Sequence, residues 1–303
     1  MVTANNLRKT YGKKNEVLAV DNVSFSVNEG EIFGLIGPDG AGKTSLFRML
    51  TTLLLPDGGS AAVAGFDVVK DYRQIRNTVG YMPGRFSLYP DLSVEENLNF
   101  FATVFGTTIQ QNYDLIKEIY VQLEPFKNRR AGKLSGGMKQ KLALCCALIH
   151  KPTVLFLDEP TTGVDPVSRK EFWEMLKRLK RQNITILVST AYMDEATLCD
   201  RIALIHSGKI LSVDTPANIS SSYPDILFAV KANRMSALLN ALSNFQKTLS
   251  SYAFGEYAHV SVKDHEENIE NELENYLKNA GLENIEIKPV KASVEDYFIR
   301  LLK

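Results

Sequence analysis

The 303-residue sequence contains no apolar run that approaches the roughly 20 residues needed by a membrane-spanning helix. Its opening stretch, MVTANNLRKTYGKKNE, also has no apolar segment of the kind that forms the core of a secretory signal peptide. We therefore expect a cytoplasmic protein. If it works at a membrane, another chain must supply the part that crosses the bilayer.

The sequence also has no excess of charge of either sign, because 35 Lys and Arg residues balance 35 Asp and Glu residues. A protein that binds DNA or RNA through its backbone phosphates normally carries a basic surface. The one local basic run, within 127–133, is expected to be a solvated loop. Nucleic acid is therefore not an expected partner.

Cysteine is scarce, with only Cys145, Cys146 and Cys199. Their spacing does not suggest a disulfide framework or a metal site, and we expect buried, reduced thiols. The 45% apolar and 23% charged residues are ordinary for a globular protein. The length indicates about two domains.

Short apolar runs alternate with helical patterns through most of the chain. The run at 32–36 and the stretches PTVLFLDEP and NITILVST have the character of buried strands, the second ending in acids, and the segment 168–180 has the spacing of an amphipathic helix. This alternation predicts an α/β fold with a parallel sheet covered by helices on both faces. Residues 84–150 are predicted to be mostly helical.

The pattern changes at about residue 220. Strand-like and helical segments then follow in an order that resembles a small βαββαβ layer, the ferredoxin-like order, with one more helix at the end. We therefore expect a second, α+β domain over 220–303. Its acidic helix at 265–280 is expected to present a solvated face.

The stretch GPDGAGKT, from Gly37 to Thr44, matches the pattern G-x-x-x-x-G-K-[ST] in full. Glycines let successive backbone N–H groups point at phosphate oxygens, and the helix that begins here adds its positive end. A chance glycine turn is the alternative, but the position between a buried strand and an amphipathic helix favours phosphate binding. The predicted nucleotide-binding residues are Gly37, Pro38, Asp39, Gly40, Ala41, Gly42, Lys43, Thr44 and Ser45.

Two acids, Asp158 and Glu159, follow the buried run VLFL. Ligands bind at the carboxyl ends of strands in open α/β sheets. We expect Asp158 to hold Mg²⁺ through water, together with the Thr44 hydroxyl, and Glu159 to act as general base on the attacking water. Two acids after a strand can also simply favour a helix N-terminus, but their pairing with the phosphate loop favours catalysis.

The stretch LSGGM predicts a helix that begins at Ser135, where Gly136 and Gly137 leave backbone N–H groups open to an anion. A plain helix cap would not explain both glycines. The phosphate loop, LSGGMKQ, LFLDEPTTGVDP and their order resemble the ATP-binding subunit of an ABC transporter over about residues 1–220. Of these motifs, LSGGM is the most specific to that family.

The resemblance implies a P-loop NTPase cassette over 1–219, with a RecA-like core sheet and a helical subdomain at about 84–150. It implies a head-to-tail dimer in which ATP and Mg²⁺ lie between the Walker A loop of one chain and the LSGGM signature of a second ABC ATP-binding chain. It also implies ATP hydrolysis coupled to a transmembrane permease subunit. The protein would then be peripheral on the cytoplasmic face of the cell membrane.

The resemblance also implies roles for single residues outside these motifs. Tyr11 resembles the aromatic residue that stacks on adenine, although a plain surface tyrosine is a fair rival interpretation. Asp165 resembles the acid that links the two ATP sites of the dimer. Asp39 stands where Asn is commoner.

Two positions depart from the family pattern. Gly84 stands where the family usually has the Gln that senses Mg²⁺ and the attacking water, and Ala191 stands where it has the His that contacts the γ-phosphate. We therefore expect a site that binds Mg-ATP well and hydrolyses it slowly. Because the signature is intact, it could complete a productive site on a different chain, which favours a heterodimer.

The resemblance leaves several functions to weigh. The C-terminal stretch SVEDYFIRLL resembles exporter-type ATPases of drug and antibiotic efflux that pair with ABC-2 permeases. Phe86 and Tyr89 are either anchors for the permease or part of the subdomain core. A nearly inert regulatory subunit is the alternative function. A soluble ABC protein acting on ribosomes or DNA is disfavoured, because the chain has one cassette and no long heptad run.

Overall fold

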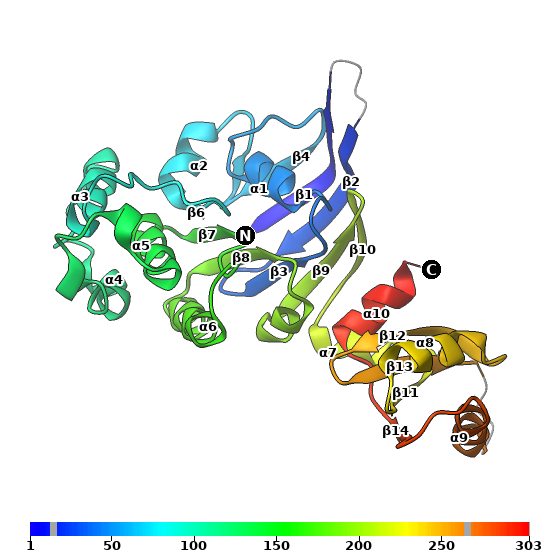
Figure 1. Ribbon diagram of the computed structural model, residues 1–303. Helices are drawn as coiled ribbons and strands as arrows, with labels where there is room; N and C mark the ends of the chain where they lie inside the picture. The colour runs from blue at the N-terminus through cyan, green and yellow to red at the C-terminus, as the bar shows by residue number, and fades with distance from the viewer. Residues whose placement is uncertain (13–16, 264–267, 303) are drawn as a thin grey trace. The chain divides into compact units, whose positions relative to one another are not determined.

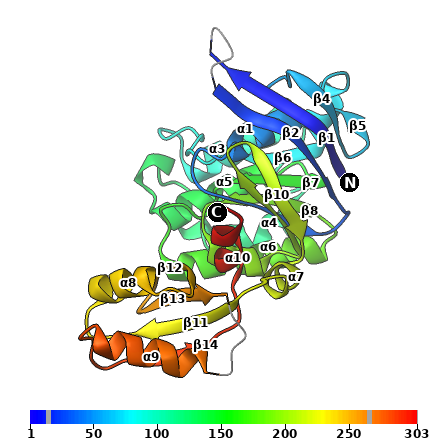
Figure 2. The same ribbon diagram turned by 90° about the vertical axis from the view of Figure 1, so that its right-hand side faces the viewer.

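The computed structural model describes residues 1–12, 17–263 and 268–302, and the chain divides into two compact units, Met1–Pro216 and Ala217–Lys303. We refer to these as the first unit and the second unit. Figures 1 and 2 show the elements of each unit from two sides.

The first unit is built on a six-stranded sheet with the strand order β10-β9-β3-β8-β7-β6. Neighbouring strands from β9 to β6 run parallel, and only β10 runs antiparallel, to β9. Every residue of β3, β7 and β8 is buried, as a parallel sheet covered on both faces requires. The predicted parallel sheet is therefore confirmed. Its strands are β3 (Ile32–Ile36), β6 (Val79–Met82), β7 (Val154–Asp158), β8 (Thr185–Thr190), β9 (Arg201–His206) and β10 (Lys209–Asp214).

An antiparallel sheet that the sequence analysis did not predict also belongs to the first unit. Its strand order is β2-β1-β4-β5, and it shares one hydrophobic core with helix α1. Tyr11 is the last residue of β1. The elements are β1 (Val2–Tyr11), β2 (Val17–Val27), β4 (Gly58–Val63), β5 (Phe66–Asp67), α1 (Lys43–Leu50) and α2 (Tyr72–Thr78).

Residues after β6 form the predicted helical segment. A capping box joins Ser93 and Glu96 at the start of α3, and the Ser135 hydroxyl accepts a hydrogen bond from the Met138 N–H at the start of α5. These local signals fix where two of the helices begin. The helices are α3 (Val94–Val104), α4 (Tyr113–Tyr120) and α5 (Gly136–Leu148), with short 3₁₀ turns at Glu124–Phe126 and Ala131–Lys133. The later part of the first unit adds α6 (Pro166–Arg181) and the 3₁₀ segment η3 (Met193–Leu198).

The second unit is a four-stranded antiparallel sheet with the order β12-β13-β11-β14. One hydrophobic core joins α8 and α9 to its strands, and Figure 2 shows these helices running along the sheet. The helix expected at 265–280 begins at Ile269, and residues 264–267 lie outside the described residues. The elements are α7 (Pro216–Ser221), β11 (Ile226–Lys231), α8 (Met235–Asn244), β12 (Thr248–Phe254), β13 (Tyr257–Val262), α9 (Ile269–Asn279), β14 (Glu286–Pro289) and α10 (Val294–Leu301).

Within 1–12, 17–263 and 268–302, every helix is too short or too polar to cross a membrane.

Candidate nucleotide-binding site

The phosphate loop connects the end of β3 to the start of α1. Gly42, the residue before α1, has a left-handed backbone with φ of 103°. A Cβ atom there would also lie 2.2 Å from the carbonyl oxygen of Ala19, closer than any side chain can be placed. Glycine at this position therefore satisfies both the turn and the packing of β2 against the loop.

Lys43 joins the phosphate loop to the acidic end of β7. Its side chain is 3% exposed, and its Nζ donates hydrogen bonds to the carbonyl oxygens of Gly37 at 2.8 Å and Pro38 at 3.0 Å. The same Nζ lies 3.2 Å from Glu159 Oε1 and 3.9 Å from Asp39 Oδ1. The structure thus brings together two motifs that are more than a hundred residues apart in the sequence.

Asp158 and Glu159 are held in place by Ser189 on the neighbouring strand β8. The Ser189 hydroxyl donates to Asp158 Oδ1 at 2.5 Å, and the Glu159 N–H donates to the Ser189 carbonyl oxygen at 3.0 Å. Glu159 has a φ of 49°, which a non-glycine residue adopts only when its surroundings impose it. Ser189 was not predicted as a site residue, because its role depends on the pairing of β7 with β8.

A pocket of about 530 Å³ opens beside these acids. It combines three of the predicted site residues, Thr44, Asp158 and Glu159, with two arginines that the sequence analysis did not identify. Arg48 follows Thr44 by four residues on α1 and so lies on the same helix face. The pocket is lined by Thr44, Arg48, Pro83, Gly84, Arg85, Asp158 and Glu159.

Gly84 lies against the acidic end of β7. A Cβ atom at this position would be 3.0 Å from the Asp158 carbonyl oxygen and 3.7 Å from the Glu159 Cβ. The loop after β6 therefore reaches the site at the position where the family usually has Gln. A side chain at 84 would begin in tight contact with the backbone that carries Asp158.

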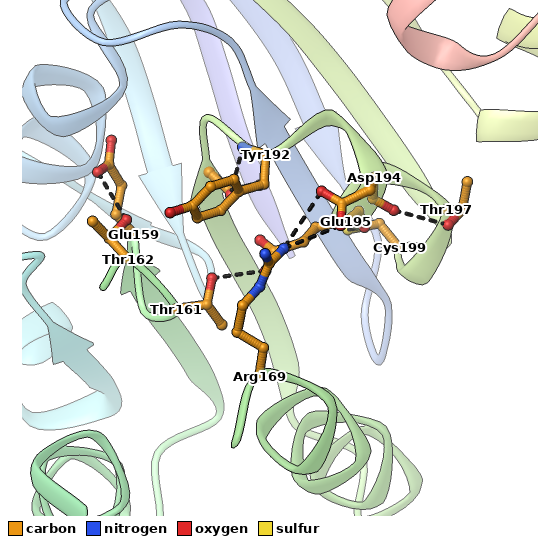
Figure 3. A network of polar contacts seen from close by, with 10 residues as sticks. Glu159, Thr161, Thr162, Arg169, Tyr192, Asp194, Glu195, Thr197 and Cys199 are labelled. Carbon is orange, nitrogen blue, oxygen red and sulfur yellow. Dashed lines mark hydrogen bonds and ion pairs between the residues drawn. The ribbon is translucent and has the colours of Figure 1, made fainter. Parts of the chain in front are cut away.

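Ala191 follows β8 and begins a segment tied to helix α6 (Figure 3). The Tyr192 ring packs on the Arg169 guanidinium with 4.2 Å between the guanidinium carbon and the ring centre. Arg169 also contacts Asp194 at 3.2 Å and Glu195 at 3.1 Å, and Glu195 is 1% exposed. These contacts set the course of the chain after Ala191, whose methyl group itself offers no hydrogen bond.

Tyr11 lies at the phosphate loop, whereas Asp165 lies at the start of α6. The Tyr11 hydroxyl lies 3.1 Å from the Ser45 hydroxyl, so an exposed aromatic ring stands at the edge of the phosphate loop. Asp165 caps α6 by accepting from the N–H groups of Val167 and Ser168, and hydrogen bonds from Ser168 and Val167 lower its pKa. Neither side chain lines the pocket described above.

The LSGGM stretch lies apart from this pocket in the same chain, since Ser135, Gly136 and Gly137 are absent from its described lining. A Cβ atom at Gly137 would be 2.9 Å from the Ser168 hydroxyl oxygen. Gly137 therefore permits α5 and α6 to approach closely, a packing reason that adds to the accessible N–H groups expected from the sequence.

Among the described residues 1–12, 17–263 and 268–302, no three or more His, Cys, Asp or Glu side chains are grouped so that they could hold a metal on their own. The three cysteines are buried, and burial raises the pKa of each thiol. Their inert character agrees with the expectation of reduced, structural thiols.

The chain matches the ABC transporter family model over residues 20–162. It is also 38% identical over 300 residues to "Nod factor export ATP-binding protein I" of Burkholderia lata, an alignment that covers 98% of this chain and 95% of the relative. The chain therefore belongs to the ABC transporter family, as one of its ATP-binding subunits, and proteins of this family are ATPases.

Two further relatives and one solved structure extend this result. The chain is 41% identical over 217 residues to "Doxorubicin resistance ATP-binding protein DrrA" of Mycobacterium tuberculosis, covering 71% of this chain and 65% of the relative. It is 45% identical over 225 residues to "Probable multidrug ABC transporter ATP-binding protein YbhF" of Escherichia coli, covering 73% of this chain but only 39% of the relative's length. A structure titled "Structure of ATP binding subunit of ABC transporter" superposes with a TM-score of 0.66 at 26% identity, over 74% of this chain and 93% of the other.

Proposed function

We propose that this chain is the ATP-binding and ATP-hydrolysing motor subunit of an ABC exporter. The observation that carries the proposal is the meeting of Lys43 and Glu159, with 3.2 Å between the ammonium nitrogen and the carboxylate oxygen. A cation that can bind phosphate and a carboxylate that can accept a proton from water are the two groups that phosphoryl transfer to water requires at one place.

The oxygens of Thr44 and Asp158 fit Mg²⁺, because this ion prefers hard oxygen ligands and takes the rest of its shell from phosphates and water. In this proposal the N–H groups of the loop Gly37–Thr44 bind the phosphates and Lys43 contacts the β- and γ-phosphates. Bound Mg²⁺ would neutralise charge that develops on the phosphates. Glu159 orients the attacking water and accepts its proton, and Tyr11 stacks on the adenine.

The second half of the ATP site is proposed to come from another ABC ATP-binding chain. Ser135, Gly136 and Gly137 would present helix N–H groups to the nucleotide of the partner, and Asp165 would link the two sites. Because these residues stand apart from the pocket of their own chain, a head-to-tail dimer gives them a function. We propose that the cassette spans 1–219 and that 220–303 forms a separate α+β domain.

The chain's own site is proposed to be slow. Gly84 has no side chain, and the Ala191 methyl group cannot donate a hydrogen bond, so neither position offers a side-chain donor to the γ-phosphate or the attacking water. Losing one preorganised donor typically lowers kcat by about 10²–10³. Phosphate binding uses separate contacts at the loop, so we infer tight binding with slow turnover, and two unequal sites when the partner is a different chain.

Coupling to an ABC-2 type permease is proposed for the helical segment. Phe86 and Tyr89 are 40% and 48% exposed, and the Tyr89 ring packs edge-on against Phe100, itself 39% exposed. This leaves an aromatic surface that a cytosolic helix of a permease would cover. The printed names of the relatives, which concern export and drug resistance, support an exporter. The protein would then sit on the cytoplasmic face of the membrane.

The direct test is Mg-ATP binding by the purified full chain and by Lys43→Ala. Loss of Lys43 removes a buried cation from the phosphates, and we expect Mg-ATP affinity to fall by at least about tenfold, as for a hydrogen bond to a charged group. Lys177→Ala, which removes a partly exposed lysine on α6 that pairs with Glu174, is the matched control and should bind normally. Equal Mg-ATP affinity in all three proteins would refute the proposed site.

A further inference from the structure

Arg85 is a positively charged group of the pocket, and its side chain has no ion pair or hydrogen bond to any residue in 1–12, 17–263 or 268–302. Lys43 is engaged by two loop carbonyls and by Glu159. Arg48 lies close enough to Tyr81 to act on that hydroxyl, whose pKa burial raises to about 12 and the Arg48 charge moderates. Arg85 is therefore available to a ligand.

The place of Arg85 in the chain matters as much as its charge. It directly follows Gly84, the position with no side chain, and lines the same pocket as Thr44, Asp158 and Glu159. Because Gly84 adds no atoms beyond its backbone, the adjoining space is open to a long neighbouring side chain. Both acids of the pocket attract a guanidinium toward the end of the site where the terminal phosphate is proposed to lie.

We propose that Arg85 contacts the γ-phosphate of bound ATP and strengthens ATP binding, while the attacking water still lacks the donors that positions 84 and 191 do not provide. This inference rests on the proposed function, since it needs ATP in this pocket. The planar guanidinium offers five donors in a fixed fork that matches two phosphate oxygens at once, which a lysine ammonium cannot reproduce. Arginine plays this part toward transferred phosphoryl groups in other P-loop proteins.

The proposal is tested by comparing Mg-ATP and Mg-ADP affinities, which does not depend on turnover. We expect Arg85→Ala to weaken Mg-ATP binding by at least about tenfold, as for a hydrogen bond to a charged group, and to leave Mg-ADP binding unchanged. Arg85→Lys should recover only part of the Mg-ATP affinity. The matched control is Arg181→Ala, which removes an exposed arginine at the end of α6 and should change neither affinity.

The outcomes distinguish a direct contact between Arg85 and the γ-phosphate from long-range electrostatic attraction by the Arg85 charge. If Arg85→Ala weakens Mg-ATP and Mg-ADP equally, or if Arg85→Lys restores binding in full, Arg85 acts only through its long-range charge and the inference is wrong. It is also wrong if Arg85→Ala and Arg181→Ala bind alike. A wild-type chain that binds neither nucleotide would overturn the proposed function together with this inference, whereas the other results overturn the inference alone.

Discussion

Replacing Gly84 with alanine isolates the contact between the loop after β6 and the acidic end of β7. The added Cβ atom would lie 3.0 Å from the Asp158 carbonyl oxygen, inside the 3.4 Å at which ordinary van der Waals contact begins. The backbone of a buried strand must therefore move by a few tenths of an ångström. Overpacking of this kind costs about 1–3 kcal/mol, which corresponds to a loss in Tm of roughly 2–12 °C for a unit of this size.

Gly84→Ala should also affect Mg-ATP binding, because the residue that it displaces is Asp158. Asp158 is 2% exposed and its carboxylate is fixed by Ser189, so a shift of its backbone moves the proposed Mg²⁺ ligand. We expect Gly84→Ala to weaken Mg-ATP binding more than magnesium-free ATP binding. Gly84→Gln carries the same Cβ atom, so this family-like substitution is expected to restore less activity than a comparison with the family pattern alone suggests.

The assay is thermal unfolding combined with nucleotide titration of the full chain, with Gly58→Ala as control. A Cβ atom at Gly58 would meet only the Arg8 Cβ, at an ordinary 3.6 Å. Both substitutions reduce the freedom of the unfolded chain in the same way, so their difference reports the contact at 84. A Tm for Gly84→Ala equal to or above that of Gly58→Ala, with unchanged Mg-ATP affinity, would refute the reasoning.

Two further predictions concern single carboxylates. Glu159→Gln should stop hydrolysis and raise the affinity for Mg-ATP, because the neutral amide no longer competes with phosphate for Lys43. Affinity is measured by titration calorimetry, and Mg-ATP binding equal to or weaker than that of the wild type would count against this competition. Burial alone would raise the pKa of Asp296, but hydrogen bonds from His259, Ser293 and Tyr252 lower it to about 2. Its stabilisation, about 2 kcal/mol, is present above pH 4 and is lost as the pH falls toward 2. Asp296→Asn should therefore unfold more readily at pH 7, and the difference from wild type in denaturant titrations should narrow between pH 4 and 2.

The motifs that act through local sequence were the most predictable. GPDGAGKT specifies its own turn and helix start, and the parallel strands around it are recognisable as unbroken apolar runs. Ser93 and Ser135 each mark the start of a helix, because each side chain accepts a hydrogen bond from the backbone N–H three residues later. In such stretches the residues that determine the structure are neighbours in the chain.

The features that escaped prediction depend on residues far apart in the sequence. Strand β1 pairs with β2 and β4 through registers interrupted by bulges, which hide the regular alternation of a strand. The predicted βαββαβ order includes a strand at the place of β12, but the polar sequence TLSSYAF gives no apolar alternation that would locate its ends. Ser189 and Arg85 look ordinary in the sequence and gain a place beside Asp158 only when strands and loops come together.

The most direct test of a site that binds ATP well but hydrolyses it slowly is the single-turnover rate of Mg-ATP hydrolysis by the purified homodimer. Glu159→Gln serves as the blank, and wild type is compared with Ala191→His. A histidine at 191 would restore one donor to the γ-phosphate, and we expect the rate to rise by about 10²-fold with little change in Mg-ATP affinity. A wild-type rate well above the blank and unaffected by Ala191→His would contradict the account.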